Sequence, residues 1–160
     1  EMQVLQGFSA QVASNTRVLI LGSMPGMASL TAGQYYAHPR NRFWPMLAAI
    51  FGVPEPTDIA GKSALLLENG LALWDVLAGC EITGSSDASI RGAVPNDLTR
   101  ILDVCPIVRV VCNGSTAGRL YRKHMRFPKL PMFTLPSTSP ANAVWNLPRL
   151  IEVWRAALTI

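Results

Sequence analysis

Two short segments carry most of the side chains that could do chemistry. The first contains a Gly/Pro loop, Gly22-Ser-Met-Pro-Gly26, and continues as Gln34-Tyr-Tyr-Ala-His-Pro-Arg-Asn-Arg-Phe-Trp44. It supplies loop amides, a tyrosine pair, a histidine, an asparagine and two arginines. The second, Leu135-Pro-Ser-Thr-Ser-Pro-Ala141, is a short, rigid loop whose amides and hydroxyls could hold a phosphate. Aromatic rings interleaved with arginine suit a nucleobase together with its phosphates.

The positive charge is mostly arginine and is unevenly distributed. The formal net charge is +4, from 14 Lys and Arg against 10 Asp and Glu. No carboxylate occurs in residues 2–54 or 104–151, and most of the arginines fall there. If these acid-free segments fold onto one face, that face attracts a polyanion. Scattered, solvated charges are the alternative, and charge alone does not decide between the two.

Length and composition indicate one folded domain covering residues 1–160. A chain of 160 residues with 49% apolar side chains can bury a proper core. No apolar run approaches the roughly 20 residues that span a bilayer, and no secretory signal pattern opens the chain. We therefore expect a soluble, cytoplasmic protein without a membrane partner, and nothing demands more than a monomer.

The cysteines and histidines predict no metal site and no cofactor. Cys80, Cys105 and Cys112 are an odd number without CxxC spacing, which disfavours a disulfide framework, a zinc ribbon or an iron–sulfur cluster. His38 and His124 add no paired ligand spacing. We expect buried thiols in a reducing compartment.

Strand-like and helix-like segments alternate along the chain. The expected strands are residues 17–21, 71–76, 107–112 and 132–135; the expected helices are 41–51, 61–69, 96–104, 115–125 and, starting late because of Pro148, about 146–158; residues 84–89 are expected to form a loop. This order predicts an α/β fold, with three α/β/α layers around a mostly parallel, four- to five-stranded sheet. Ligands bind beyond the carboxyl ends of such strands, where the loops 22–26, 113–114 and 135–140 lie.

The joint order and spacing of the motifs resemble the uracil-DNA glycosylase superfamily, and most closely its hypoxanthine-DNA glycosylase and mismatch-specific G/U branches. The G-x-x-P-G loop, the segment Ala37-His-Pro-Arg-Asn-Arg-Phe-Trp44 and the loop Leu135-Pro-Ser-Thr-Ser139 carry this resemblance across roughly residues 17–143. It implies a uracil-DNA glycosylase-like fold and cofactor-free base excision repair chemistry. The enzyme would flip a deaminated base, hypoxanthine by preference, out of double-stranded DNA and hydrolyse its N-glycosidic bond.

Two positions depart from the mismatch-specific pattern. Met24 stands where that branch has a water-positioning asparagine, and Leu135 stands where a polar residue helps the leaving base. Both departures disfavour ordinary uracil excision. The form Gly-Ser-Met-Pro-Gly with Tyr-Tyr-Ala-His-Pro-Arg-Asn is instead similar to the hypoxanthine branch, which implies catalytic roles for Asn41 and Asn113.

The resemblance and the residue chemistry together suggest a role for each site residue. Ser23, Met24, Tyr36 and His38 are expected to bind the base, with Tyr36 stacking on it. Asn41 would orient a water through its carbonyl oxygen. The expected DNA contacts are Arg40, Ser137, Thr138, Ser139, Pro140 and Ala141. Because neither motif contains a lysine, a Schiff base and strand nicking are not expected.

Each of these roles has a plainer alternative that the sequence leaves open. Asn41 is a good helix cap, Tyr35 and Tyr36 could be core aromatics, and His38 could be a loop hydrogen-bonder. The basic residues of 119–126 could be the solvent-exposed face of a helix. Asp75 is interpreted as a structural residue. The alternative functions are a G/U or G/T mismatch glycosylase, a non-catalytic DNA-binding module and a small-molecule phosphate binder.

Overall fold

A parallel sheet of four strands forms the centre of the molecule. The computed structural model describes residues 2–83 and 90–159. The strands lie in the order β3 (Leu71–Asp75), β2 (Val18–Gly22), β6 (Arg109–Asn113) and β7 (Met132–Leu135), and every neighbouring pair is parallel. This confirms the predicted α/β class and places all four strands within two residues of their expected bounds.

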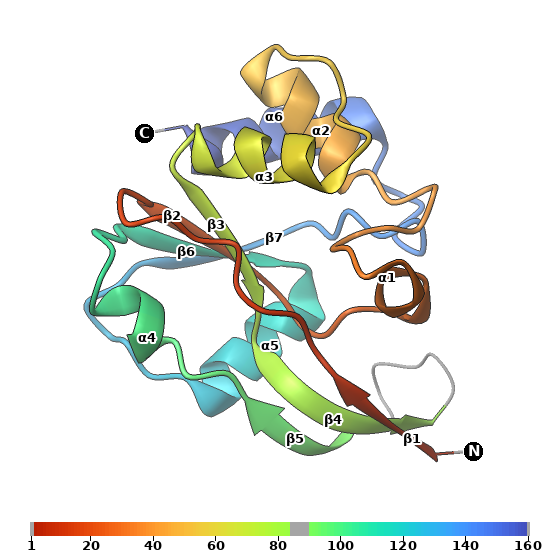
Figure 1. Ribbon diagram of the computed structural model, residues 1–160, viewed down its shortest axis with the longest axis vertical. Coiled ribbons are helices and arrows are strands. Elements are labelled where there is room, and N and C mark those ends of the chain that lie inside the picture. The colour runs from red at the N-terminus through yellow and green to blue at the C-terminus, as the bar shows by residue number, and fades with distance from the viewer. Residues whose placement is uncertain (1, 84–89, 160) are drawn as a thin grey trace.

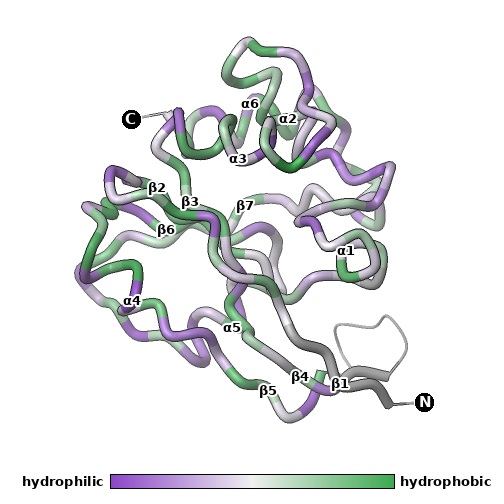
Figure 2. The backbone as a smooth tube through the Cα atoms, in the orientation of Figure 1, coloured by the Kyte–Doolittle hydropathy of each residue, from purple (hydrophilic) through white to green (hydrophobic). Residues whose placement is uncertain are grey.

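Strands β2 and β3 are nearly continuous apolar runs because the sheet is covered on both faces. All five residues of β2 and all five of β3 are buried, including Asp75 at the end of β3. The hydropathy colouring in Figure 2 shows the hydrophobic stretch along these strands. Burial of this kind fixes the strands firmly and leaves the loops at their carboxyl ends to carry function.

Helices cover both faces of this sheet, as predicted. On one side lie α2 (Phe43–Phe51), α3 (Ile59–Leu67) and α6 (Leu147–Leu158), and on the other lie α4 (Thr99–Leu102) and α5 (Ser115–His124) (Figure 1). The Asn146 side chain accepts a hydrogen bond from the Arg149 N–H at 3.0 Å and starts α6 where the sequence places its beginning.

The sequence did not predict a second sheet and one short helix. The strands β1 (Met2–Gln6), β4 (Leu77–Thr83) and β5 (Arg91–Pro95) form an antiparallel sheet in the order β1-β4-β5, below the main sheet in Figure 1. Helix α1 (Met27–Ala32) follows the first Gly/Pro loop. With only six residues, α1 is too short to show an apolar periodicity.

The predicted helix over residues 96–104 is wrong in length, because only α4 (Thr99–Leu102) is helical. Asn96, the first residue of the predicted range, lies outside the helix and donates its side-chain amide to the backbone carbonyl of Asp75 at 2.8 Å. It thereby holds the junction between β3 and β4. The loop expected over residues 84–89 lies outside the described residues.

Within the described part of the chain, no helix has the length and apolar character required to cross a bilayer. The same residues contain no group of three or more His, Cys, Asp or Glu side chains that could hold a metal ion.

Candidate active site

The loops at the carboxyl ends of the four parallel strands enclose a pocket of about 910 Å³. Its walls come from the loop after β2, the segment before α2, the end of β3, the start of α5 and the loop after β7. The volume lies within the range of roughly 300–1,000 Å³ that is usual for small-molecule sites. The two chemistry-bearing segments of the sequence, far apart along the chain, therefore meet at one cavity.

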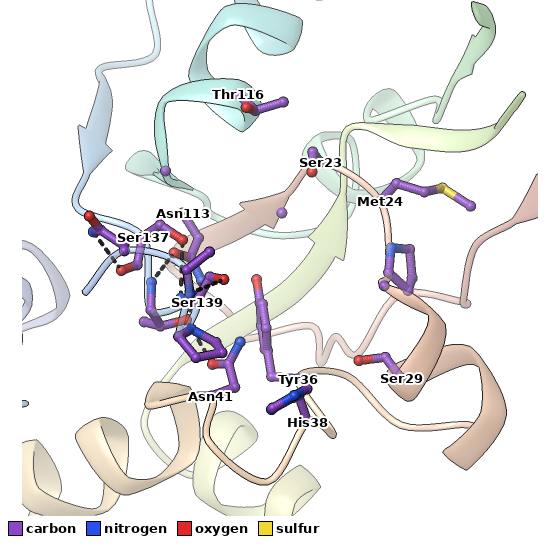
Figure 3. A pocket seen from close by; sticks show the side chains of 18 of the residues that line it. Ser23, Met24, Ser29, Tyr36, His38, Asn41, Asn113, Thr116, Ser137 and Ser139 are labelled. Atoms are coloured by element: carbon purple, nitrogen blue, oxygen red, sulfur yellow. Dashed lines mark hydrogen bonds between the residues drawn. The ribbon is translucent and has the colours of Figure 1, made fainter. Parts of the chain in front are cut away.

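The two predicted catalytic asparagines, Asn41 and Asn113, lie on the same side of the pocket in Figure 3, and hydrogen bonds through Thr138 join them. Asn113 accepts from the Thr138 backbone N–H and donates to the Thr138 hydroxyl oxygen, each at 3.0 Å. That hydroxyl in turn donates to Asn41 Oδ1 at 2.9 Å. Thr138 is fully buried, so its side chain is not free to contact a DNA backbone as predicted. It fixes the positions of Asn113 and Asn41 instead.

The side-chain amide of Asn41 is oriented by its partners. Oδ1 accepts a second hydrogen bond from the Phe43 backbone N–H at 3.0 Å, at the start of α2. Both acceptor positions of the oxygen are thus occupied. The bond to Phe43 is the helix-cap contact of the plainer alternative, and the expectation that this oxygen orients a water stays a prediction. The NH₂ group has no hydrogen-bond partner among the described residues and is the part of Asn41 left for a ligand.

Hydrogen bonds from Arg42 link the loop after β7 to the start of α2. Its guanidinium donates to the backbone carbonyls of Thr138 at 3.0 Å, Ser139 at 2.8 Å, Asn142 at 3.2 Å and Trp145. Its backbone N–H also donates to the Thr138 carbonyl at 3.1 Å. The sequence offers Arg42 only as a positive charge, because its acceptors lie about a hundred residues away. The planar, multi-donor guanidinium suits such a fan of acceptors.

The two tyrosines have different surroundings. Tyr35 is buried and donates its hydroxyl to the Ser9 carbonyl at 3.0 Å, which confirms the core alternative for that ring. Tyr36 lines the pocket, adopts the left-handed backbone conformation with φ of 52°, and stacks on Phe43 at a centroid distance of 4.2 Å. Phe43 thus backs one face of the Tyr36 ring. That the ring stacks on a base stays a prediction.

Asp75 closes the pocket at the end of β3. The residue is 3% exposed, and its Oδ2 atom has no hydrogen-bond partner among the described residues. Burial raises the pKa of this carboxyl to about 7 from its ordinary 3.8. The pKa of the Tyr36 hydroxyl is also raised, mainly by burial and to a smaller extent by the nearby Asp75 carboxylate. The neighbouring Asn113 amide partly opposes this rise.

Gly22 makes room for these two polar groups. A Cβ atom at this position would lie 2.5 Å from Asp75 Oδ1 and 3.0 Å from the Tyr36 hydroxyl oxygen. The first glycine of the motif is therefore required for close approach, since its φ is not in the left-handed region. Gly114, with φ of 98°, plays the corresponding part at the start of α5, where a Cβ would lie 3.1 Å from Ser137 Cβ.

The comparison with known protein families agrees with the motif pattern. The family model described as the uracil DNA glycosylase superfamily matches residues 10–158. The chain belongs to the uracil DNA glycosylase superfamily. This confirms the family resemblance inferred from the motifs, and it makes the protein a DNA N-glycosylase, a hydrolase, by family.

Similar proteins extend this assignment over nearly the whole chain. A Methanosarcina acetivorans protein named hypoxanthine DNA glycosylase is 35% identical over 156 residues, which is 96% of this chain and 97% of that protein. A Schizosaccharomyces pombe protein named G/U mismatch-specific uracil DNA glycosylase is 33% identical over 102 residues, 62% of this chain and 30% of that protein. An NMR solution structure from M. acetivorans, described as a candidate uracil DNA glycosylase, superposes with a TM-score of 0.85. It is 31% identical and covers 98% of this chain and 97% of its own.

Most of the remaining predicted residues of this glycosylase-family site line the pocket. The set comprises Ser23, Met24, His38, Ser137, Ser139, Pro140 and Ala141. His38 accepts a hydrogen bond from the Arg40 N–H at Nδ1, at 3.1 Å, which matches its loop alternative. Arg40 is exposed and does not line the pocket.

Trp145 and its contact with Arg149 were not predicted from the sequence. Trp145 lines the pocket, and the Arg149 guanidinium lies 4.1 Å from its ring centroid. The position of Trp145 just after the second motif was a usable signal, because aromatic residues next to arginine suit nucleic acid.

Four basic side chains are exposed on or just after α5, as the plainer alternative for them requires: Arg119, Arg122, Lys123 and Arg126.

Proposed function

We propose that this protein is a monofunctional DNA glycosylase that acts as a monomer, through one domain, on double-stranded DNA carrying a deaminated base. Hypoxanthine is the favoured base. The observation that carries the proposal is the single pocket at which Asn41, Asn113 and the loop after β7 meet, joined through Thr138. The full-length similarity to a protein named hypoxanthine DNA glycosylase supports the choice of base.

The reaction begins with extrusion of the target nucleotide from the duplex. This costs a few kcal/mol and least for a mispaired base, which gives part of the selectivity. The pocket volume of about 910 Å³ accommodates a purine with its sugar. The exposed part of the loop after β7, with Ser139, Pro140 and Ala141, would face the DNA backbone, and the free guanidinium of Arg40 would contact phosphates near the rim.

Bond cleavage produces a cation-like sugar and an anionic base, so the nucleophile needs positioning more than deprotonation. We assign the positioning to the NH₂ group of Asn41, because its oxygen is already held by Phe43 and Thr138. An N–H donor holds the water through one of its lone pairs and leaves another to attack the sugar. Loop amides that face the departing base spread its negative charge, as an oxyanion hole does.

No lysine lines the described part of the pocket, and Lys62 is bonded to the Gln34 side chain at 2.8 Å. We therefore propose hydrolysis without a covalent imine, so that the product is an abasic site in an unbroken strand. Alkali treatment would be required to cleave that strand.

The test is single-turnover base release from matched duplexes containing hypoxanthine, uracil or xanthine. We expect hypoxanthine to be released fastest, and Asn41→Ala to lose at least about tenfold in rate, or about 1.4 kcal/mol of barrier. Asn15→Ala, at an exposed asparagine outside the pocket, is the matched control and should keep the parent rate.

A second variant separates the two chemical roles of Asn41. Asn41→Asp keeps the acceptor oxygens but removes the N–H donor, so we expect it to be as slow as Asn41→Ala. An Asn41→Asp enzyme that matches the parent would refute the donor role. Binding of all three duplexes without any base release would instead indicate a DNA-binding module. Faster release of uracil than of hypoxanthine would favour the mismatch-specific activity named for the S. pombe relative.

A further inference from the structure

One of the four tryptophans has surroundings unlike those of the other three. Trp44, Trp74 and Trp154 are buried, and each donates its indole N–H to a backbone carbonyl, at 2.9, 2.9 and 3.0 Å. Trp145 is only half-buried, and its indole N–H has no hydrogen-bond partner among the described residues. Because Trp145 also lines the pocket, it lies where the pocket meets the molecular surface.

The indole of Trp145 is held in a fixed position. Its backbone N–H donates to the Asn142 carbonyl at 3.2 Å, and its own carbonyl accepts from the Arg42 guanidinium. The Arg149 guanidinium lies over the ring at 4.1 Å from its centroid and also donates to the Val144 carbonyl at 3.0 Å. A ring fixed in this way loses little conformational entropy when a ligand packs on it.

The surface beside the indole is apolar and carries no negative charge. Val144 is 78% exposed, the largest fraction among the exposed large hydrophobic residues of the described chain. No Asp or Glu occurs in residues 104–151. A flat aromatic ring with an exposed apolar neighbour and a cation beside it suits the face of a nucleobase, whereas a phosphate would require several N–H or O–H donors.

We propose that the ring of Trp145, backed by Arg149, stacks on the base next to the flipped nucleotide in the same DNA strand, and that excision therefore depends on the identity of this neighbouring base. Purines should be favoured over pyrimidines, because they offer the larger face for stacking. This inference rests on the proposed function and names a determinant of sequence context that lies outside the recognition of the flipped base itself.

The neighbouring base is the one that loses a stacking partner when the target nucleotide leaves the duplex. Successive bases of one strand are about 3.4 Å apart along the helix axis, so extrusion uncovers a base face directly beside the gap. The sugar of the extruded nucleotide stays joined to that neighbour through one phosphate. A base held in the pocket therefore keeps its neighbour at the edge of the pocket, where Trp145 lies.

A purely structural role does not explain the exposure of this ring. The backbone of residue 145 is bonded through both its N–H and its C=O, so the indole is not required to hold that part of the chain in place. A stacking role does explain it. The exposed apolar face is unfavourable in water, and a base that covers it removes this cost.

The experiment is a double-mutant cycle between protein and DNA, measured as equilibrium binding of the full chain. The probe is a duplex in which the target deoxyinosine carries a 2′-fluorine, which slows cleavage by destabilising the cation-like sugar. Both neighbouring bases are adenine, and one of them at a time is replaced by a baseless tetrahydrofuran spacer. Because every protein meets the same DNA, the effect of the spacer on the duplex itself cancels in the cycle.

Three substitutions at one position separate stacking from bulk. Trp145→Ala removes the ring, Trp145→Leu replaces it with an aliphatic side chain, and Trp145→Phe keeps a flat aromatic face. The matched control is Phe133→Ala, because Phe133 is 46% exposed, lies 5.9 Å from the Arg109 guanidinium and does not line the pocket. Urea denaturation checks that each variant is folded.

The readout is the ratio of affinities for the adenine and spacer duplexes. For one of the two spacer positions, we expect this ratio to be about tenfold higher in the parent and in Phe133→Ala than in Trp145→Ala. Trp145→Leu should resemble Trp145→Ala, and Trp145→Phe should recover most of the parent ratio. A Trp145→Ala ratio equal to that of the parent at both positions overturns the proposal, even where Trp145→Ala binds all duplexes more weakly.

Base release separates failure of this inference from failure of the proposed function. Single-turnover release of hypoxanthine is measured from duplexes with purine or pyrimidine neighbours. We expect the purine-to-pyrimidine rate ratio to be at least about threefold higher in the parent than in Trp145→Ala. Equal ratios in two active enzymes overturn this inference alone. A parent that releases no hypoxanthine from any duplex overturns the proposed function and this inference with it.

Discussion

The buried carboxyl of Asp75 predicts a pH-dependent gain of stability when it is replaced by an amide. In the unfolded chain this carboxyl ionises at its ordinary pKa of 3.8, whereas burial raises its pKa to about 7 in the folded protein. Below about pH 4 both states are protonated, so the carboxyl carries no penalty. Between about pH 4 and pH 7 the unfolded chain releases the proton first, and the free energy of unfolding falls by about 1.4 kcal/mol per pH unit.

The full penalty is reached above pH 7 and amounts to about 4 kcal/mol, because the two pKa values differ by about 3 units. Asp75→Asn removes the ionisation and keeps the size of the side chain. Relative to the parent, the variant should therefore gain about 3 kcal/mol between pH 5 and pH 8. Any pH-independent difference in the free energy of unfolding between the parent and the Asp75→Asn protein cancels when the value at pH 5 is subtracted from the value at pH 8.

The assay is urea denaturation of parent, Asp75→Asn and Asp103→Asn at pH 5, 6.5 and 8, followed by tryptophan fluorescence. The free energies are compared at equal m-values, so that altered compactness of the unfolded state does not enter. Asp103→Asn changes the same charge at an exposed position and should show no comparable rise. A gain for Asp75→Asn that is no larger at pH 8 than at pH 5 would refute the reasoning from burial.

Two further predictions concern the packing around the site. Arg42→Ala removes the donor shared by four backbone carbonyls of the loop after β7, and should cost about 3 kcal/mol of stability in urea denaturation. Arg42→Lys should recover less than half of this, because an ammonium cannot present the same fan of donors; full recovery would show that charge alone matters. Gly118→Ala places a Cβ 2.4 Å from Thr134 Oγ1 and should cost about 1–3 kcal/mol, measured in the same way. Adding Thr134→Ala should relieve most of that cost, and failure to do so would rule out the contact as its cause.

The parallel sheet was predictable from the sequence because its strands are encoded locally. The runs Val18–Gly22 and Arg109–Asn113 combine branched apolar residues with a glycine or asparagine at the end. The antiparallel sheet was not predictable in the same way. Its middle strand, Leu77–Thr83, contains Gly79 and Glu81. It pairs regularly with β1 but with β5 through register shifts that no local pattern encodes.

The site was predictable as a set of residues but not as a set of contacts. The motifs brought Asn41, Asn113 and Ser137 to one pocket, as alternation of strands and helices requires. Which atom of Asn41 is available depends on Thr138, nearly a hundred residues away in the chain. The orientation of a side-chain amide follows from its whole hydrogen-bond network, so the sequence could not supply it.

The contacts of Thr138 link the asparagine pair to the loop after β7. Its hydroxyl holds Asn41 and Asn113, while its carbonyl accepts from the backbone N–H and the guanidinium of Arg42. Asn41 and Arg42 are consecutive at the start of α2, so the loop is bonded to that helix on both sides of one peptide. A shift of the loop must therefore stretch bonds to Asn41 and Arg42 together. The loop after β7 and the Asn41 NH₂ group should therefore move together, and a substitution such as Arg42→Ala should displace both.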